Sequence, residues 1–183
     1  MNKGKNFEHQ FKLSAEKDGL FILRLSDSSL SWQHERTSKF CVENPCDFLL
    51  FYRGHLFPFE LKSTEYKSMS IQMEAGKKAM IKMHQWNSLS NFGLFEDVEP
   101  GLILNFREKD SVEEKTYWVP IEDFIEFIST TDKVSINRLD IVQMPNSIIM
   151  EQTLKRTNYL YGVKQLLDKI IDQKGGADGK TSI

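Results

Sequence analysis

Hydrophobic and polar residues alternate along this chain with two different periods, which predicts a mixture of helices and strands. Phe7, Phe11 and Ala15 recur at helical spacing and predict a helix over residues 5–17. Gly19 follows this segment and is expected to end the helix. The apolar run at 20–25 then predicts a strand.

The remaining elements follow from the same two periods and from the positions of glycine and proline. Short apolar runs predict further strands at 101–107 and 116–119, and a β-hairpin over 47–63. Helical spacing predicts helices over 74–90, 120–128 and 157–173, with a helical turn at 135–144 and a connector at 68–71.

This order of elements is typical of an α/β fold with a mixed central sheet flanked by helices. The chain has 183 residues, enough for one domain with its own core, so a single domain is expected over 1–174. The glycine-rich composition at 175–183 predicts a disordered tail, and the polar stretch at 26–43 predicts a loop or flap.

Composition and charge limit the function classes only weakly. The net charge is −2, which does not point to a nucleic-acid binder, and the scattered lysines fit solvated helix faces as well as a basic surface. No apolar run is long enough to span a membrane, and no signal-peptide core is expected at the start. Cys41 and Cys46 lack partner histidines at metal-binding spacing, so a reducing cytoplasmic setting is favoured.

Three charged residues of the predicted hairpin carry the candidate chemistry. Asp47 opens the first arm, and Glu60 and Lys62 share one face of the second arm because strand side chains alternate with period two. A turn near Arg53-Gly54 can bring Asp47 to the Glu60 end of the ladder. Converging carboxylates suit Mg²⁺ or Mn²⁺, and a neighbouring lysine can hold a phosphate or a water. This arrangement indicates nuclease chemistry.

The alternative is that these charges occupy a solvated strand face. An acid-x-Lys triplet arises easily by chance in a chain of which 27% is charged. The apolar surroundings favour the functional interpretation, because charges at the end of a buried strand carry an energetic cost. The hairpin's apolar residues are Phe48, Leu49, Leu50, Phe51, Leu56, Phe57 and Phe59.

The spacing resembles the PD-(D/E)XK nuclease superfamily, with Glu60-Leu61-Lys62 as the (D/E)XK element. Pro45-Cys46-Asp47 departs from that pattern by one extra residue between the proline and the acid. The resemblance implies a restriction-endonuclease-like core.

Four stretches in the same order also resemble the RecU-type Holliday junction resolvases of Gram-positive bacteria and their phages. They are Gly4–Glu8, the hairpin from Asp47 to Thr64, Ile81–Gln85 with Phe92-Gly93, and a weaker pair at Ser135-Ile136 and Asn158–Leu160. Proteins of that family tend to be basic, whereas this chain is not.

The resemblance implies a set of site residues. The catalytic residues would be Glu8, Asp47, Glu60, Lys62 and Gln85, and the metal would bind Asp47, Glu60 and the carbonyl of Leu61. The DNA-contacting residues would be Lys5, Thr64, Lys67, Lys78 and Lys82. Simpler interpretations remain open: an exposed helix residue for Glu8, a helix-surface residue for His84, a turn former for Thr64 and a loop anchor for Trp32 rather than, with His34, a DNA contact.

The resemblance implies a Mg²⁺-dependent endonuclease that resolves four-way DNA junctions as a homodimer, with a strand-exchange recombinase as an expected partner. Dimer contacts are expected from Phe51 and Phe57, or from a stripe of Tyr159, Val163 and Leu167. There are two alternatives. One is another PD-(D/E)XK endonuclease of restriction or repair type, and the other is a junction binder that does not cleave.

Overall fold

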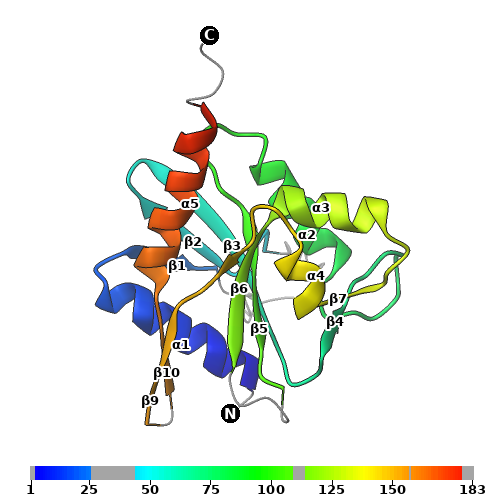
Figure 1. Ribbon diagram of the computed structural model, residues 1–183, viewed down its shortest axis with the longest axis horizontal. Coiled ribbons are helices and arrows are strands. Elements are labelled where there is room, and N and C mark those ends of the chain that lie inside the picture. Colours follow the sequence, from blue (N-terminus) through cyan, green and yellow to red (C-terminus); the bar gives the residue numbers. More distant parts are fainter. Residues whose placement is uncertain (1–2, 26–43, 109–113, 157, 179–183) are drawn as a thin grey trace, which may run out of the picture.

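The computed structural model describes residues 3–25, 44–108, 114–156 and 158–178 and centres on a six-stranded sheet (Figure 1). The elements are α1 (Lys3–Lys17), β1 (Phe21–Arg24), β2 (Phe48–Tyr52), β3 (His55–Thr64), β4 (Ser68–Ser70), α2 (Met83–Phe92), β5 (Gly101–Phe106), β6 (Lys115–Pro120), α3 (Ile121–Thr130), β7 (Ser135–Asn137), α4 (Arg138–Val142), β8 (Ile148–Ile149), β9 (Gln152–Lys155), β10 (Asn158–Tyr161) and α5 (Val163–Asp178).

The strand order in the main sheet is β1-β2-β3-β5-β6-β8. All neighbouring pairs are antiparallel except β3 and β5, which run parallel and are joined by a connection that contains α2. The predicted fold class, a mixed central sheet flanked by helices, is confirmed. A helix, three antiparallel strands, a helix and a parallel strand is also the order expected of a restriction-endonuclease-like core.

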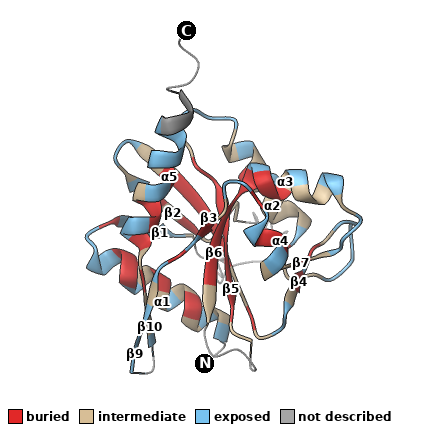
Figure 2. Ribbon diagram, viewed as in Figure 1, coloured by how far each residue is buried: buried red, intermediate tan, exposed pale blue. Residues whose placement is uncertain are grey.

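Helices cover both faces of this sheet, and Figure 2 shows the buried residues concentrated on its strands. On one face, α1 and α5 enclose a core around Phe11, Phe48 and Phe59. On the other face, α2, α3 and α4 enclose a second core around Leu102 and Leu104. No helix in the described parts of the chain is long and apolar enough to cross a membrane.

The β2–β3 hairpin is confirmed and has its turn at the expected position. Arg53 and Gly54 both have positive φ, 50° and 86°, which is the backbone of a type I′ turn. This turn fixes the register that pairs Phe48 with Phe59. The residue before β2 continues the pairing, because the Asp47 N–H donates to the Phe59 carbonyl at 3.1 Å.

The helix predicted over 74–90 is wrong in its first half, because α2 begins only at Met83. The backbone before it returns to β4 instead: Ile81 forms a parallel bridge with Ile71, and the Met80 and Ile81 amides donate to the Ser70 carbonyl. Gly76, with φ at +81°, provides the reversal that makes this return possible. Ser68–Ser70, predicted as a connector, consequently forms strand β4 paired with β7.

The C-terminal third contains strands where helix was predicted. Asn158–Tyr161 forms β10 and pairs with β9, so α5 begins only at Val163. The apolar residues at 159–161 therefore follow a strand, and α5 itself extends to Asp178, into the segment predicted as a tail. Within the segment predicted as a helical turn at 135–144, β7 precedes the short helix α4. The stretch 26–43, predicted as a loop, lies outside the described residues.

The packing of β5 against β6 provides a test of this core. A Cβ at Gly101 would lie 2.2 Å from Trp118 Nε1 and 2.8 Å from the Val119 carbonyl oxygen. Gly101→Ala should therefore lower the free energy of unfolding by ~1–3 kcal/mol, measured by urea denaturation. The matched control is Gly175→Ala on α5, where a Cβ meets nothing within 4 Å and should be neutral or slightly stabilising. Equal stability of the two variants would contradict the packing of this strand pair.

Candidate active site

The alternation of side chains along β3 separates its apolar residues from its charged residues. Phe59 and Leu61 are buried in the core beneath α1 and α5. Glu60 and Lys62 must therefore project from the opposite face of the sheet. Glu60 is only 2% exposed, so its side chain is buried and has little contact with water. The predicted placement of Glu60 and Lys62 on one strand follows from this register.

Asp47 reaches the same place from the start of β2. Its Oδ2 accepts a hydrogen bond from the backbone N–H of Leu61 at 2.8 Å. Its own backbone N–H is bound to Phe59, the residue just before Glu60. These two bonds hold the Asp47 carboxyl beside the Glu60 strand position, as the hairpin geometry predicted.

Two side chains neutralise or hold the Glu60 carboxylate. Lys62 Nζ donates to Glu60 Oε1 at 2.7 Å, and the Gln85 side-chain amide donates to the same oxygen. The Oε1 of Gln85 accepts from the Lys82 backbone N–H at 3.0 Å. Gln85 therefore connects the first turn of α2 to Glu60, which fixes the position of both.

The pKa values of the two acids show that their burial beside each other opposes ionisation. Burial, followed by the nearby charge of Glu60, raises the pKa of Asp47 from 3.8 to about 7. Burial also raises the pKa of Glu60, against the opposing effect of Lys62. The buried thiol of Cys46 has its pKa raised to about 12, chiefly by burial and then by the two carboxyls. The thiol is therefore protonated and does not act as a nucleophile.

Glu8 approaches this site from α1, and its carboxylate pairs with the guanidinium of Arg24 on β1. The Arg24 contact was not among the predicted site residues. The sequence gives no pattern that links an arginine in an apolar strand to a glutamate on a helix. The contact between Arg24 and Glu8 depends on the antiparallel pairing that sets Arg24 opposite Phe48. Glu8 is thus ion-paired rather than a solvated helix residue.

All five residues predicted to be catalytic border one cavity of about 320 Å³. Its lining consists of Glu8, Asp47, Glu60, Leu61, Lys62, Lys82, His84 and Gln85. Three separate elements, α1, the β2–β3 hairpin and the start of α2, supply these residues. The structure therefore brings together groups that are far apart in the sequence; their catalytic roles remain a prediction.

The residues predicted to contact DNA are more dispersed. Lys82 borders the 320 Å³ cavity, whereas Lys67 lies at a second cavity with Arg138. Lys5 and Lys78 are exposed. Thr64 is buried and its Oγ1 accepts from the Tyr66 N–H at 3.1 Å, which is the turn-forming role considered as the alternative. Trp32, His34 and Cys41 lie outside the described residues.

The donor set fits a hard divalent cation. Two carboxylates of raised pKa face one polar cavity, and a cation between them would remove the repulsion that opposes their ionisation. Asp47 and Glu60 would hold it, with the backbone of Leu61 bordering the same cavity. The parts of the chain that the structure describes contain no group of three or more His, Cys, Asp or Glu side chains set to hold a metal, so oxygens from the backbone, water or substrate would complete the shell.

Comparison with known proteins adds the following. No protein-family model matches the chain. A solved structure of Hjc, a Holliday junction resolvase from Archaeoglobus fulgidus, is similar with a TM-score of 0.47 and 15% identity, over 80% of this chain and 95% of that one. The SPbeta prophage-derived uncharacterized protein YotM of Bacillus subtilis (strain 168) is 30% identical over 187 residues, which cover 97% of this chain and 91% of YotM. The chain therefore belongs to the same protein family as YotM.

Proposed function

We propose that this protein is a metal-dependent DNA endonuclease that resolves four-way junctions. The observation that carries the proposal is the joint placement of Asp47 and Glu60 at one polar cavity, with Lys62 and Gln85 on Glu60. Burying two acids side by side lowers the stability of the fold. An arrangement with this cost points to a function that requires both carboxylates.

The chain's own residues divide the work of phosphodiester hydrolysis. A bound Mg²⁺ or Mn²⁺ would polarise the scissile phosphate and lower the pKa of a water. The Leu61 N–H holds Asp47 in place, and Gln85 holds Glu60 while remaining fixed to the first turn of α2. Lys62, which lies beside Glu60, would orient the attacking water or stabilise charge on the phosphate.

Junction specificity and dimerisation are parts of the same proposal. The support for junctions is the order of the four stretches that resemble RecU-type resolvases. A four-way junction has two equivalent strands to cut, so a two-fold enzyme with two sites suits it. A strand-exchange recombinase is proposed as a functional partner on the same basis.

Two alternatives have the same site. An endonuclease of restriction or repair type would use identical residues on linear DNA. A junction binder without activity is less favoured, because unneeded carboxylates would repel phosphates. The direct experiment is to incubate labelled four-way junction and linear duplex of equal length with and without Mg²⁺. Preferential cleavage of the junction supports the proposal; equal cleavage supports the first alternative, and binding without cleavage supports the second.

The carboxylates can be tested by isosteric substitution. Asp47→Asn and Glu60→Gln should each lower the cleavage rate at least about 100-fold, because each removes a charge from the cation site. Junction affinity in the absence of metal should stay the same or rise, since a charge that repels phosphate is gone. The measurement is single-turnover cleavage together with fluorescence anisotropy.

Glu126→Gln, an exposed residue of α3, is the matched control and should cut at the wild-type rate. If Asp47→Asn and Glu60→Gln also cut at that rate, these two carboxylates do not form the active site.

The raised pKa of Asp47 predicts a pH dependence of stability. The folded chain retains a proton on Asp47 up to about pH 7, whereas the unfolded chain releases it near pH 3.8. The stability contribution of this group is therefore complete below pH 3.8 and is lost as pH rises through about 7. With chelator present, denaturation should show lower stability at pH 8 than at pH 5, and Asp47→Asn should reduce the difference. Mg²⁺ should stabilise the wild type more at pH 8 than at pH 5; equal stabilisation would argue against binding by ionised Asp47 and Glu60.

The proposed dimer predicts a mass near twice 21.3 kDa by light scattering. Of the predicted contact residues, Phe57, Val163 and Leu167 are fully buried in the core, so they are unavailable to a partner. Phe51 is 53% exposed, and it faces Phe21, 61% exposed, across the β1–β2 pair. Phe51→Glu should therefore give a monomer that remains folded, with Leu154→Glu on β9 as the control. A wild-type protein that is monomeric and nicks one strand per encounter would exclude the resolvase and leave a simpler nuclease.

A further inference from the structure

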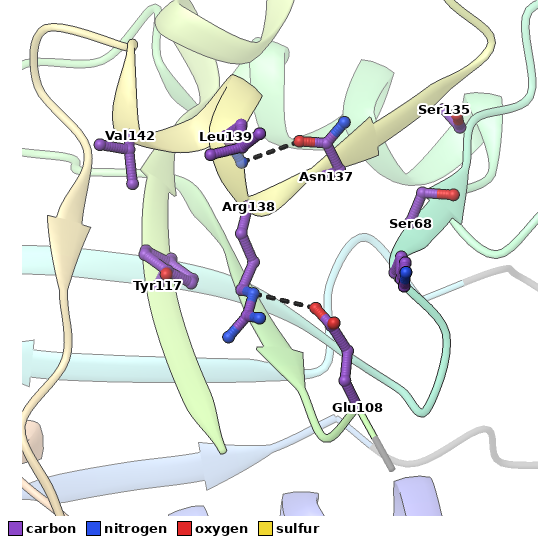
Figure 3. Close-up of a pocket in the computed structure, with 9 residues that line it drawn as sticks. Ser68, Glu108, Tyr117, Ser135, Asn137, Arg138, Leu139 and Val142 are labelled. Carbon is purple, nitrogen blue, oxygen red and sulfur yellow. Dashed lines mark hydrogen bonds and ion pairs between the residues drawn. The ribbon is translucent and has the colours of Figure 1, made fainter. Parts of the chain in front are cut away.

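A second and larger cavity, of about 700 Å³, lies between β6, β7 and α4 (Figure 3). It shares no lining residue with the 320 Å³ cavity of the candidate active site. Its volume lies within the ~300–1,000 Å³ typical of ligand sites in proteins. Its walls combine basic, aromatic, aliphatic and hydroxyl-bearing side chains, which is an unusual mixture for a gap between packed elements.

The sheet register relates the large cavity to the candidate active site. Lys62 on β3 pairs with Leu104 on β5, and Leu104 pairs with Tyr117 on β6. Residues in direct register share a face, so Tyr117 lies on the same face of the sheet as Lys62, two strand spacings or ~10 Å away. Leu104 between them is fully buried, so the row itself is covered and the register gives only the separation of the two cavity walls. The chain that leaves β3 also brings Lys67 and Ser68 to the cavity wall.

The charges in the cavity favour an anion. Arg138 Nε lies 2.9 Å from Glu108 Oε1, and the Arg138 side chain extends between Tyr117 and Glu108 (Figure 3). This ion pair fixes the position of the Arg138 guanidinium. Lys67 adds a second positive charge, so among the described lining residues two cations face one carboxylate.

The rest of the lining suits a partly apolar group with a polar edge. Leu139 and Val142 of α4 are 76% and 66% exposed, which leaves their apolar surface available, whereas Tyr117 is 6% exposed and borders the cavity with only a small part of its surface. Asn137 Oδ1 accepts from the Leu139 and Asp140 amides at 2.8 and 3.1 Å, and within the described residues its side-chain N–H₂ group faces no acceptor. The Ser68 hydroxyl provides a further donor and acceptor.

We propose that this cavity holds one unpaired nucleotide of the DNA strand whose backbone enters the candidate active site. The base would pack against the exposed aliphatic side chains of Leu139 and Val142, above the small exposed part of Tyr117, and Arg138 and Lys67 would contact its phosphate. The proposal rests on the proposed nuclease function, and it adds a substrate feature: DNA with an unpaired or mismatched base is preferred over uninterrupted duplex.

Binding measured without cleavage tests this subsite independently of the nuclease chemistry. The probes are two labelled duplexes of the same sequence in chelator, one fully paired and one with a single unpaired nucleotide. Wild-type protein should bind the second about tenfold more tightly. Arg138→Gln and Leu139→Glu should each abolish this preference while changing affinity for the paired duplex less than about twofold. Because Leu139 is exposed, its variant has no reason to unfold.

Lys169→Gln on α5, which is packed against the opposite face of the sheet, is the control and should retain the preference. The subsite is excluded if the wild type binds both duplexes equally or if Arg138→Gln weakens both to the same extent. If a labelled acidic peptide binds at this cavity more tightly than the DNA with an unpaired nucleotide, the nucleotide proposal is wrong and the surface is assigned to a protein partner. Failure of Mg²⁺-dependent cleavage with the preference retained would instead refute the nuclease and leave the subsite intact.

Discussion

The close approach of two carboxyl groups at a buried strand is the constraint on which the rest of the site depends. Glu60 is almost fully buried and Asp47 is fixed beside it, so the pair cannot both ionise without a compensating charge. Lys62 supplies part of that charge within the protein. Under the proposed function, a bound cation would supply the rest. The burial of the two acids also couples the stability of the fold to pH, because the pKa of Asp47 is raised to about 7.

The surrounding fold holds this unfavourable pair by fixing the backbone on both sides of it. A type I′ turn sets the β2–β3 register, and the parallel pairing of β3 with β5 places Glu60 in the middle of the sheet. Gln85 then ties Glu60 to the first turn of α2. The cost of burying Glu60 is thereby offset by hydrogen bonds from two elements, Lys62 on β3 and Gln85 on α2.

Glu60 and Lys62 of one cavity and Tyr117 of the other lie on one face of the sheet, opposite to α1 and α5. The face beneath α1 and α5 is occupied by aromatic packing around Phe11 and Phe59. The opposite face carries Lys62 and Tyr117 in the same register row. Leu104, which lies between them in this row, is fully buried, so the row belongs to the second core and is not an open surface.

Local pattern was sufficient for the hairpin, for α1 and for the grouping of Asp47, Glu60 and Lys62, because turn chemistry and period-two alternation act between near neighbours. It failed at 74–81 and 158–161, where pairing with the preceding extended segment of the chain, at Ile71 and at β9, outweighs helical spacing. The sequence by itself thus determined the acids, the lysine and the strand that carries them. Only the tertiary structure decided that Arg24 pairs with Glu8 and that Gln85 holds Glu60, because these contacts join elements whose separation in the chain leaves no periodic trace.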